Sequence, residues 1–435
     1  MFKLHYRLLI SLLLIFPVFA KGQFLMDMID TTKEEGRGML SIYKKFDHLK
    51  ISGYIQPQFQ LADTAGIKTF EGVDFPTHVS NRFMLRRSRI RMDYVHYDKT
   101  NGPGVQIVFQ FDVNERGFTI RDVWGRLFDN KFKLFSFTTG MFARPMGYET
   151  NLSSSDRETP ERGRMNQTLM KSERDLGAML SFEPRRKEGL LKYLKIDGGF
   201  FNGQGINASG DFDNHKDFIS RIAWKPYPVT NKMILSAGVS TLQGGLLQNT
   251  KYRYSTVTVG GIEKEVVDSS ESNNGAIAPR KYYGADLQLK LKNKTGFTEL
   301  RGEVIAGTQT GTSNSSETPA LLLTGKEAFY IRHFNGAYFY FLQHLFSVNH
   351  QLVIKYDWYD ANSRVKGKEI GAAGNGFTAA DIKYSTLGVG YVYYMTENAK
   401  LMLYYARVWN EKTSLPGYTT DLKDNVFTCR LQFRF

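Results

Sequence analysis

The sequence predicts an all-β fold: a transmembrane antiparallel β-barrel of about sixteen strands, with long extracellular loops and short periplasmic turns. Three observations predict it. Apolar and polar residues alternate over segments of about ten residues, and the connections between segments alternate between long and short. Aromatic residues make up 14% of the chain although its mean hydropathy is −0.35. A membrane barrel combines these properties because its strands are apolar outside and polar inside, with aromatic rings at both interfaces.

The N-terminus predicts a secretory signal peptide. Lys3 and Arg7 precede an apolar run from Leu8 to Ala20, which is too short to span a membrane comfortably and contains a proline. Cleavage after Ala20 and cleavage after Gly22 both fit the pattern. We therefore expect a signal peptide at 1–20, a short periplasmic segment at 21–50 and an outer-membrane β-barrel at 51–435. A membrane anchor is the competing interpretation of the first segment.

The last segment shows the strand pattern most clearly. Phe427, Cys429 and Leu431 fall on one face, and Thr428 and Arg430 fall on the other. A period of two indicates a strand with one apolar and one polar face. We expect strands of this kind near 51–61, 82–97, 104–114, 118–128, 132–142, 174–184, 192–202, 216–226, 232–243, 281–292, 297–309, 333–346, 350–360, 383–394, 399–410 and 425–435.

The connections indicate which end of each strand faces outward. Long connections at 62–81, 143–173, 203–215, 244–280, 310–332, 361–382 and 411–424 alternate with short ones, and only the tight turn at 115–117 breaks the order. With an even strand number and a periplasmic N-terminus, all long connections lie outside the cell. About sixteen strands leave an aqueous lumen. The loop at 143–173 either folds inward and narrows that lumen or forms an extracellular flap.

The run "RRSRIR" (86–91) lies on one of the expected strands. Arg87, Arg89 and Arg91 share a face, which we assign to the lumen wall, and Ile90 lies on the opposite face toward lipid. Arg86 is then expected to point outward near the rim, where it can meet lipopolysaccharide phosphates. Arginine carries a permanent charge and forked donors, so a row of arginines favours oxyanions. The alternative is a structural wall whose arginines are paired to acids on neighbouring strands.

The loop at 143–173 carries a second group of candidate anion-binding residues. Arg144, Arg162 and Arg164 stand in it together with acidic residues such as Glu149 and Glu161. Rings of charge are a common way to build selectivity at a constriction. The alternative is a salt-bridged loop with no contact to solute.

Charge and motifs limit the classes of function. The formal charge is +14, so small anionic solutes and outer-membrane lipid or lipopolysaccharide are the expected partners. An exported chain without a nucleic-acid-binding module is not expected to bind nucleic acid. The single cysteine, Cys429, excludes an intramolecular disulfide and a cysteine-based zinc cluster. H-E-x-x-H, G-x-S-x-G and P-loop motifs are missing, so we expect no enzyme activity, no catalytic residues, no metal and no cofactor.

Several stretches together resemble the phosphate-selective porin O and P family: "RRSRIRMDY" (86–94), "VQIVFQFDV" (105–113), "GMFARPMGYE" (140–149), "SERDLGAML" (172–180), "GFFNGQGIN" (199–207) and "DNHKDFISRIAW" (213–224). The resemblance implies a homotrimeric sixteen-stranded porin that admits anions. The terminal Phe435 resembles the signal that the barrel assembly machinery reads. Where the family has Lys before a Pro-aromatic-Gly turn, this chain has "ARPMG" (143–147), so the family's phosphate-site residues are not carried over.

The sequence therefore predicts a porin of a Gram-negative outer membrane that gives passive diffusion of small anionic solutes, phosphate or related anions, through a water-filled barrel with a basic lumen. A non-conducting surface barrel for adhesion or assembly is the first alternative. An outer-membrane barrel hydrolase is the second.

Overall fold

The computed structural model describes residues 48–98, 102–186, 188–206, 208 and 210–435. The predicted signal peptide and nearly all of the predicted periplasmic segment lie outside the described residues. Residues Ile51–Phe435 form one compact unit. Among the described residues, no helix is both long enough and apolar enough to cross a membrane.

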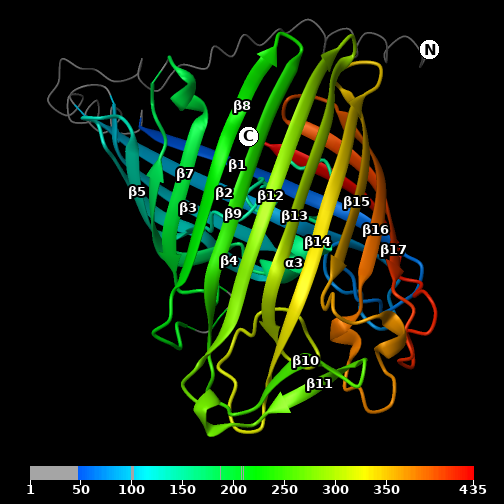
Figure 1. Ribbon diagram of the computed structural model, residues 1–435. Helices are drawn as coiled ribbons and strands as arrows, with labels where there is room; N and C mark the ends of the chain where they lie inside the picture. Colours follow the sequence, from blue (N-terminus) through cyan, green and yellow to red (C-terminus); the bar gives the residue numbers. More distant parts are fainter. Residues whose placement is uncertain (1–47, 99–101, 187, 207, 209) are drawn as a thin grey trace, which may run out of the picture. The chain divides into compact units, whose positions relative to one another are not determined.

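Sixteen antiparallel strands form a closed barrel, in which β18 pairs with β1 (Figure 1). The predicted fold class is therefore confirmed. The strands are β1 Leu49–Ala62, β2 Asn81–Tyr97, β3 Pro103–Asn114, β4 Gly117–Phe128, β5 Phe135–Ala143, β6 Arg174–Phe182, β7 Leu194–Phe201, β8 Asp217–Thr230, β9 Met233–Leu247, β12 Ile277–Asn293, β13 Gly296–Gly311, β14 Phe329–His344, β15 His350–Asp360, β16 Tyr384–Tyr394, β17 Ala399–Asn410 and β18 Val426–Arg434.

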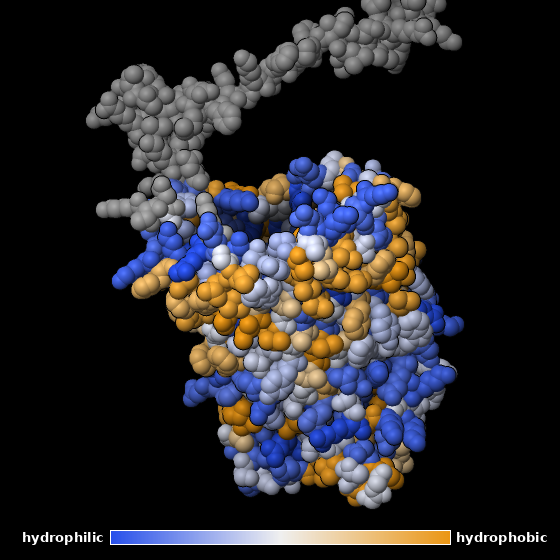
Figure 2. Space-filling view, turned by 45° about the horizontal axis from the view of Figure 1, so that its top comes forward, coloured by the Kyte–Doolittle hydropathy of each residue, from blue (hydrophilic) through white to orange (hydrophobic). Residues whose placement is uncertain are grey.

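Alternation along the strands places polar side chains inside the barrel and apolar ones outside. In β18 Thr428, Arg430 and Gln432 are buried in the interior. On the outer face Leu287 of β12 and Phe200 of β7 are 53% and 60% exposed. On the face seen in Figure 2, apolar side chains form a belt around the barrel. This arrangement is the inverse of a soluble protein and is typical of a barrel surrounded by lipid.

The two ends of the barrel differ in the length of their connections. Between successive barrel strands, one end carries short turns such as 231–232 and 294–295, and the other carries loops such as 63–80, 144–173 and 361–383. We call these the short-turn end and the long-loop end. The tight turn between β3 and β4, at 115–116, is the exception at the long-loop end, as the sequence predicts.

A hairpin at the long-loop end is absent from the sequence prediction. Strands β10 (Arg253–Val259) and β11 (Ile262–Asp268) pair within the connection from β9 to β12, and β10 lies parallel to the start of β14. Gly260 and Gly261 both have positive φ, 62° and 81°, which a two-residue hairpin turn of type I′ requires. The segment was expected to be an irregular loop because its strands are short and outside the ten-residue pattern.

Short helical segments complete the fold. Helix α3 (Arg164–Leu169) lies in the connection between β5 and β6 and packs against β15. The 3₁₀ turns are η2 Leu190–Tyr193, η3 Glu271–Asn273, η4 Gly367–Glu369 and η5 Ala379–Asp381. Only α3 enters the site described below as a helix, and η5 contributes to its wall.

Candidate functional site

The loop 144–173 folds into the barrel lumen instead of forming an extracellular flap. The backbone N–H groups of Tyr148 and Glu149 each donate to the carboxylate of Glu303 on β13, at 3.1 Å. The Glu149 carboxylate in turn accepts from Tyr340 of β14 at 2.6 Å and from Lys355 of β15 at 3.1 Å. The loop is therefore fixed to three adjacent strands on one side of the barrel.

Glu149 also accepts hydrogen bonds from within the loop. Its Oε2 atom accepts from the backbone of Gly163 and from the Asn166 side chain, each at 2.9 Å. Burial raises the pKa of Glu149, but the charge of Lys355 and the hydrogen bonds lower it more, to about 2. The carboxylate is therefore ionised at neutral pH. Its hydrogen bonds join the first part of the loop to the later part around Gly163 and Asn166.

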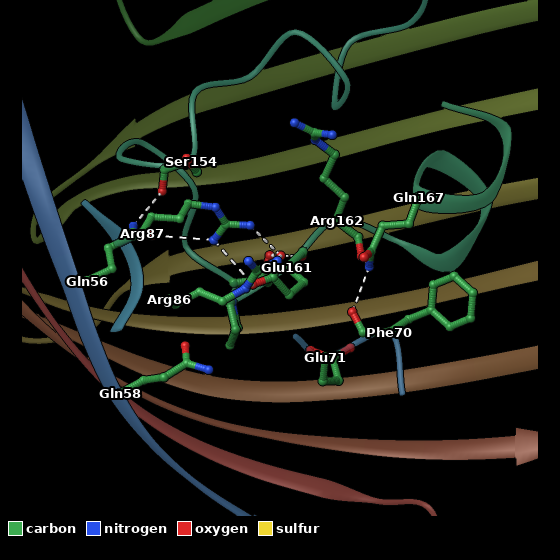
Figure 3. A network of polar contacts seen from close by, with 12 residues as sticks. Gln56, Gln58, Phe70, Glu71, Arg86, Arg87, Ser154, Glu161, Arg162 and Gln167 are labelled. Carbon is green, nitrogen blue, oxygen red and sulfur yellow. Dashed lines mark hydrogen bonds and ion pairs between the residues drawn. The ribbon is translucent and has the colours of Figure 1, made fainter. Parts of the chain in front are cut away.

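Glu161 makes the second anchor, on the opposite wall. Its oxygens lie 2.8 Å from Nε of Arg86, 2.6 Å from Nη2 of Arg87 and 3.0 Å from Nη2 of Arg430, as Figure 3 shows for the two β2 arginines. Burial raises the pKa of Glu161, but these three cations hold it well below its usual range. The loop thus bridges β13–β15 on one side and the seam of β18, β1 and β2 on the other.

The prediction that Arg86 points to the outer rim is wrong. Earlier in β2, Arg82 donates to Gln60, and Met84 accepts from Gln58, so even-numbered residues face the lumen there. From Arg87 onward odd-numbered residues face the lumen. The alternation changes parity between positions 84 and 87, and this irregularity lets two successive arginines reach Glu161.

The three predicted wall arginines point into the barrel, and each is paired with an acid. Arg87 is bound to Glu161. Arg89 donates to Asp112 of β3 and to Ser154 of the loop, each at 2.9 Å. Arg91 forms a bidentate pair with Asp93 at 2.6 and 2.8 Å.

The three predicted loop arginines lie in different surroundings. Arg162 donates to Glu173 at 2.9 Å. Arg144 is buried, where it donates to the carbonyls of Ser172 and Gly203 and lies 3.9 Å from the carboxylate of Asp175. Arg164, at the start of α3, lies 3.6 Å over the ring of Tyr384 and 4.4 Å over the ring of Phe70.

A cavity of about 1060 Å³ opens between the loop 144–173 and the barrel wall at the long-loop end. Four of the six predicted residues line it, namely Arg87, Arg89, Arg162 and Arg164, whereas Arg91 and Arg144 do not. Its lining has an excess of cations, ten against six acids. The basic residues are Lys68, Arg86, Arg87, Arg89, Arg121, Arg157, Arg162, Arg164, Lys171 and Lys423, and the acidic ones are Asp74, Asp112, Glu161, Glu173, Glu317 and Asp424.

Two cavity arginines could not be assigned from alternation. Arg121 lies in a β-bulge of β4, because Gln110 pairs with Asp122 and the next residue, Phe111, pairs with Ile120. The bulge directs both Arg121 and Asp122 inward, so Arg121 binds Glu173. Arg157 stands in the loop, where no periodicity applies. Among the described residues, no cluster of His, Cys, Asp or Glu has a geometry that could hold a metal ion.

The comparisons with known proteins agree with the fold. No protein-family model and no curated protein sequence matches the chain. The structure of OprB from Pseudomonas putida is similar with a TM-score of 0.54 at 9% identity, covering 93% of this chain and 98% of that chain. The outer membrane channel DcaP of Acinetobacter baumannii gives a TM-score of 0.50 at 10% identity, covering 89% and 97%. At these identities the likeness shows the β-barrel fold alone.

Proposed function

We propose that this protein is an outer-membrane channel for passive diffusion of small anionic solutes, phosphate or related anions among them. The observation that carries the proposal is the cavity in the lumen, whose lining holds ten basic and six acidic side chains. A low-dielectric concave wall with an excess of one charge raises the local concentration of the opposite ion. The resemblance of the sequence to phosphate-selective porins supports the same class of solute.

Passage in this proposal breaks no bond, and the concentration gradient supplies the driving force. Arg87 and Arg89 on the wall and Arg162 and Arg164 in the loop supply donors along the cavity, and Arg91 lies further along the same face of β2. The carboxylate partners of Arg87, Arg89, Arg91 and Arg162 fix these side chains in place and lower the net positive charge of the lumen. Arg144 contributes by holding the loop, because its Nη1 and Nη2 atoms donate to the Gly203 and Ser172 carbonyls.

The outer face and the chain end support the proposed location and partners. The apolar belt fits outer-membrane lipid, and basic residues near the long-loop end fit lipopolysaccharide phosphates. Phe435 follows the last strand, its backbone pairs with Gly53 of β1, and the residue is 67% exposed. A terminal aromatic in this position fits recognition by the barrel assembly machinery. A homotrimer is the expected assembly.

A second candidate, a closed barrel that serves adhesion or assembly, is favoured by the way the loop 144–173 fills the lumen. Carboxylate anchors at Glu149, Glu161 and Glu303 tie that loop to both walls. Reconstitution of the folded protein in planar bilayers separates the two. We expect discrete steps of single-channel current. Bilayers that stay closed with fully folded protein would favour the second candidate.

A further inference from the structure

The cavity has two chemically different walls. The strands β2 and β4 and the loop 144–173 supply one, which is built from guanidinium groups such as those of Arg89, Arg121 and Arg157. The loops 63–80, 361–383 and 411–425 supply most of the other. Its aromatic and aliphatic members are Phe70, Tyr359, Ile382, Tyr384, Tyr418 and Leu422, and the same loops also bring two basic and two acidic side chains to the lining, Lys68, Lys423, Asp74 and Asp424.

The arginine wall keeps hydrogen-bond donors that no described residue uses. The Nε atoms of Arg121, Arg157, Arg162 and Arg164 are buried without a hydrogen-bond partner. Arg157 is only 2% exposed, and no carboxylate among the described residues lies within ion-pair distance, 4.0 Å, of its guanidinium. The Arg157 guanidinium lines the cavity, and its charge is not neutralised by a direct ion pair with a described residue, so it can attract an anion that enters. An oxyanion is the acceptor that suits guanidinium best.

The apolar wall is held in place by the same loop that carries the arginines. Gln167 of α3 donates to the carbonyl of Phe70 at 2.7 Å, and Figure 3 shows the two residues side by side. The Arg164 guanidinium lies over both Phe70 and Tyr384 and so joins the loop 63–80 to the start of β16. Phe70 and Tyr384 are therefore fixed to the loop that carries the arginines.

The volume of the cavity is much larger than an inorganic oxyanion needs. Pockets of roughly 300–1,000 Å³ hold drug-sized ligands, and this cavity reaches about 1060 Å³. A tetrahedral ion at the arginine wall would leave the apolar wall in contact with water only. A solute that has both an anionic group and an apolar part would cover both walls.

We infer that the cavity selects organic anions with an apolar or ring-containing body, whose anionic group binds the arginine wall and whose body contacts the wall around Tyr418 and Leu422. The inference rests on the proposed channel function. In this inference Arg157 binds the anionic group. The loops 63–80, 361–383 and 411–425 determine which anions bind best.

The test compares two probes with the same head group, inorganic phosphate and phenyl phosphate, as blockers of chloride current through the protein in planar bilayers. We expect phenyl phosphate to half-block the current at about one-tenth of the phosphate concentration, since its ring buries apolar surface. Equal half-blocking concentrations in a conducting, anion-preferring channel would overturn this inference and leave the channel function standing. The absence of any current would instead defeat the channel function.

Variants test which wall causes the difference in block between the two probes. Tyr418→Ser/Leu422→Ser should reduce the tenfold difference to below about threefold while leaving block by phosphate unchanged, because both side chains are half-buried and belong to the apolar wall. Arg157→Gln should weaken block by both probes to the same extent. The matched control is Phe346→Leu, an 81% exposed ring at the short-turn end, which should keep the full difference. A wild-type difference that survives in the double variant would contradict the assignment.

Discussion

At the scale of single residues, buried carboxylates decide how the lumen is organised. Glu161 binds Arg86 and Arg87 of β2 and Arg430 of β18, and Glu173 binds Arg121, Arg162 and Arg174. Each carboxylate therefore neutralises only part of the charge around it. The remaining positive charge is what an anion entering the cavity meets.

Replacing Glu161 with Gln should change the balance between acidic and basic side chains in the lumen. The change leaves the buried Arg87 and Arg430 and the partly buried Arg86 without their anion. Loss of one partner of a buried pair costs about 3–5 kcal/mol of folding free energy. The change also removes one negative charge from the lumen, so chloride preference should rise. Thermal unfolding followed by circular dichroism and reversal potentials in a KCl gradient measure the two effects. Glu115→Gln, at an exposed turn, is the control, and equal behaviour of the two variants would contradict this role.

Glu71 should make anion preference depend on pH near neutrality. Burial raises the pKa of Glu71 to about 7, against the opposing charge of Lys355. The folded state therefore holds a proton between the unfolded pKa near 4.5 and about 7, so Glu71 favours folding less as pH rises through that window. Its ionisation adds a negative charge near the loop. Chloride preference should fall between pH 6 and 8 and should fall less in Glu71→Gln, where Asp424 of the cavity lining, whose pKa burial raises to about 6, still titrates. An unchanged fall in the variant would exclude Glu71 as a cause.

At the scale of elements, the strands were predictable from the sequence and the path of the loop 144–173 was not. A strand in a barrel shows a period of two because one side faces lipid and the other faces water, and this held even for short strands such as β5 and β7. The loop is positioned by side chains more than a hundred residues away, such as Glu303 and Lys355. No local sequence pattern indicates those contacts.

The difference between local patterns and long-range contacts also explains which site residues could be predicted from the sequence. Arg87 and Arg89 follow from alternation, whereas Arg86 and Arg121 depend on irregularities that reverse it. Whether each arginine is paired was open from the sequence, and the structure pairs Arg87, Arg89 and Arg91 with acids. The aromatic wall required the folded loops, because Phe70, Tyr384 and Tyr418 come from three separate parts of the chain.

Shortening the loop should enlarge the channel. Replacing residues 150–169 with a short Gly-Ser linker removes the segment that crosses the lumen, so single-channel conductance should increase severalfold and chloride preference should decrease. Deletion of the β10–β11 hairpin, residues 253–268, is the matched control because these strands lie outside the ring of sixteen. Unchanged conductance after loop replacement, in a folded variant, would show that the loop does not limit passage.

At the scale of the whole molecule, a closed ring of strands separates an apolar exterior from a polar interior. Because the barrel is closed, every barrel strand is paired on both sides. Such pairing is required in lipid, where no water is present to form hydrogen bonds with unpaired backbone groups. The interior is wide enough to hold a folded loop and still leave a large cavity. Fold and charge thus both suit controlled passage of solutes.

The assembly predicted by the resemblance to phosphate-selective porins is a homotrimer. Light scattering of the detergent-folded protein, corrected for bound detergent, should give a protein mass three times that of one chain. A mass of one chain at concentrations where the barrel is folded would contradict the trimer, and it would leave the properties of the single barrel unchanged.

The reversal potential of the reconstituted protein in a KCl gradient tests the central claim most directly, because it requires both conduction and selectivity. We expect steady single-channel current and a potential displaced toward the chloride equilibrium value, since the cavity lining carries more basic than acidic side chains. A potential displaced toward the potassium value, or bilayers that remain closed with folded protein, would contradict it.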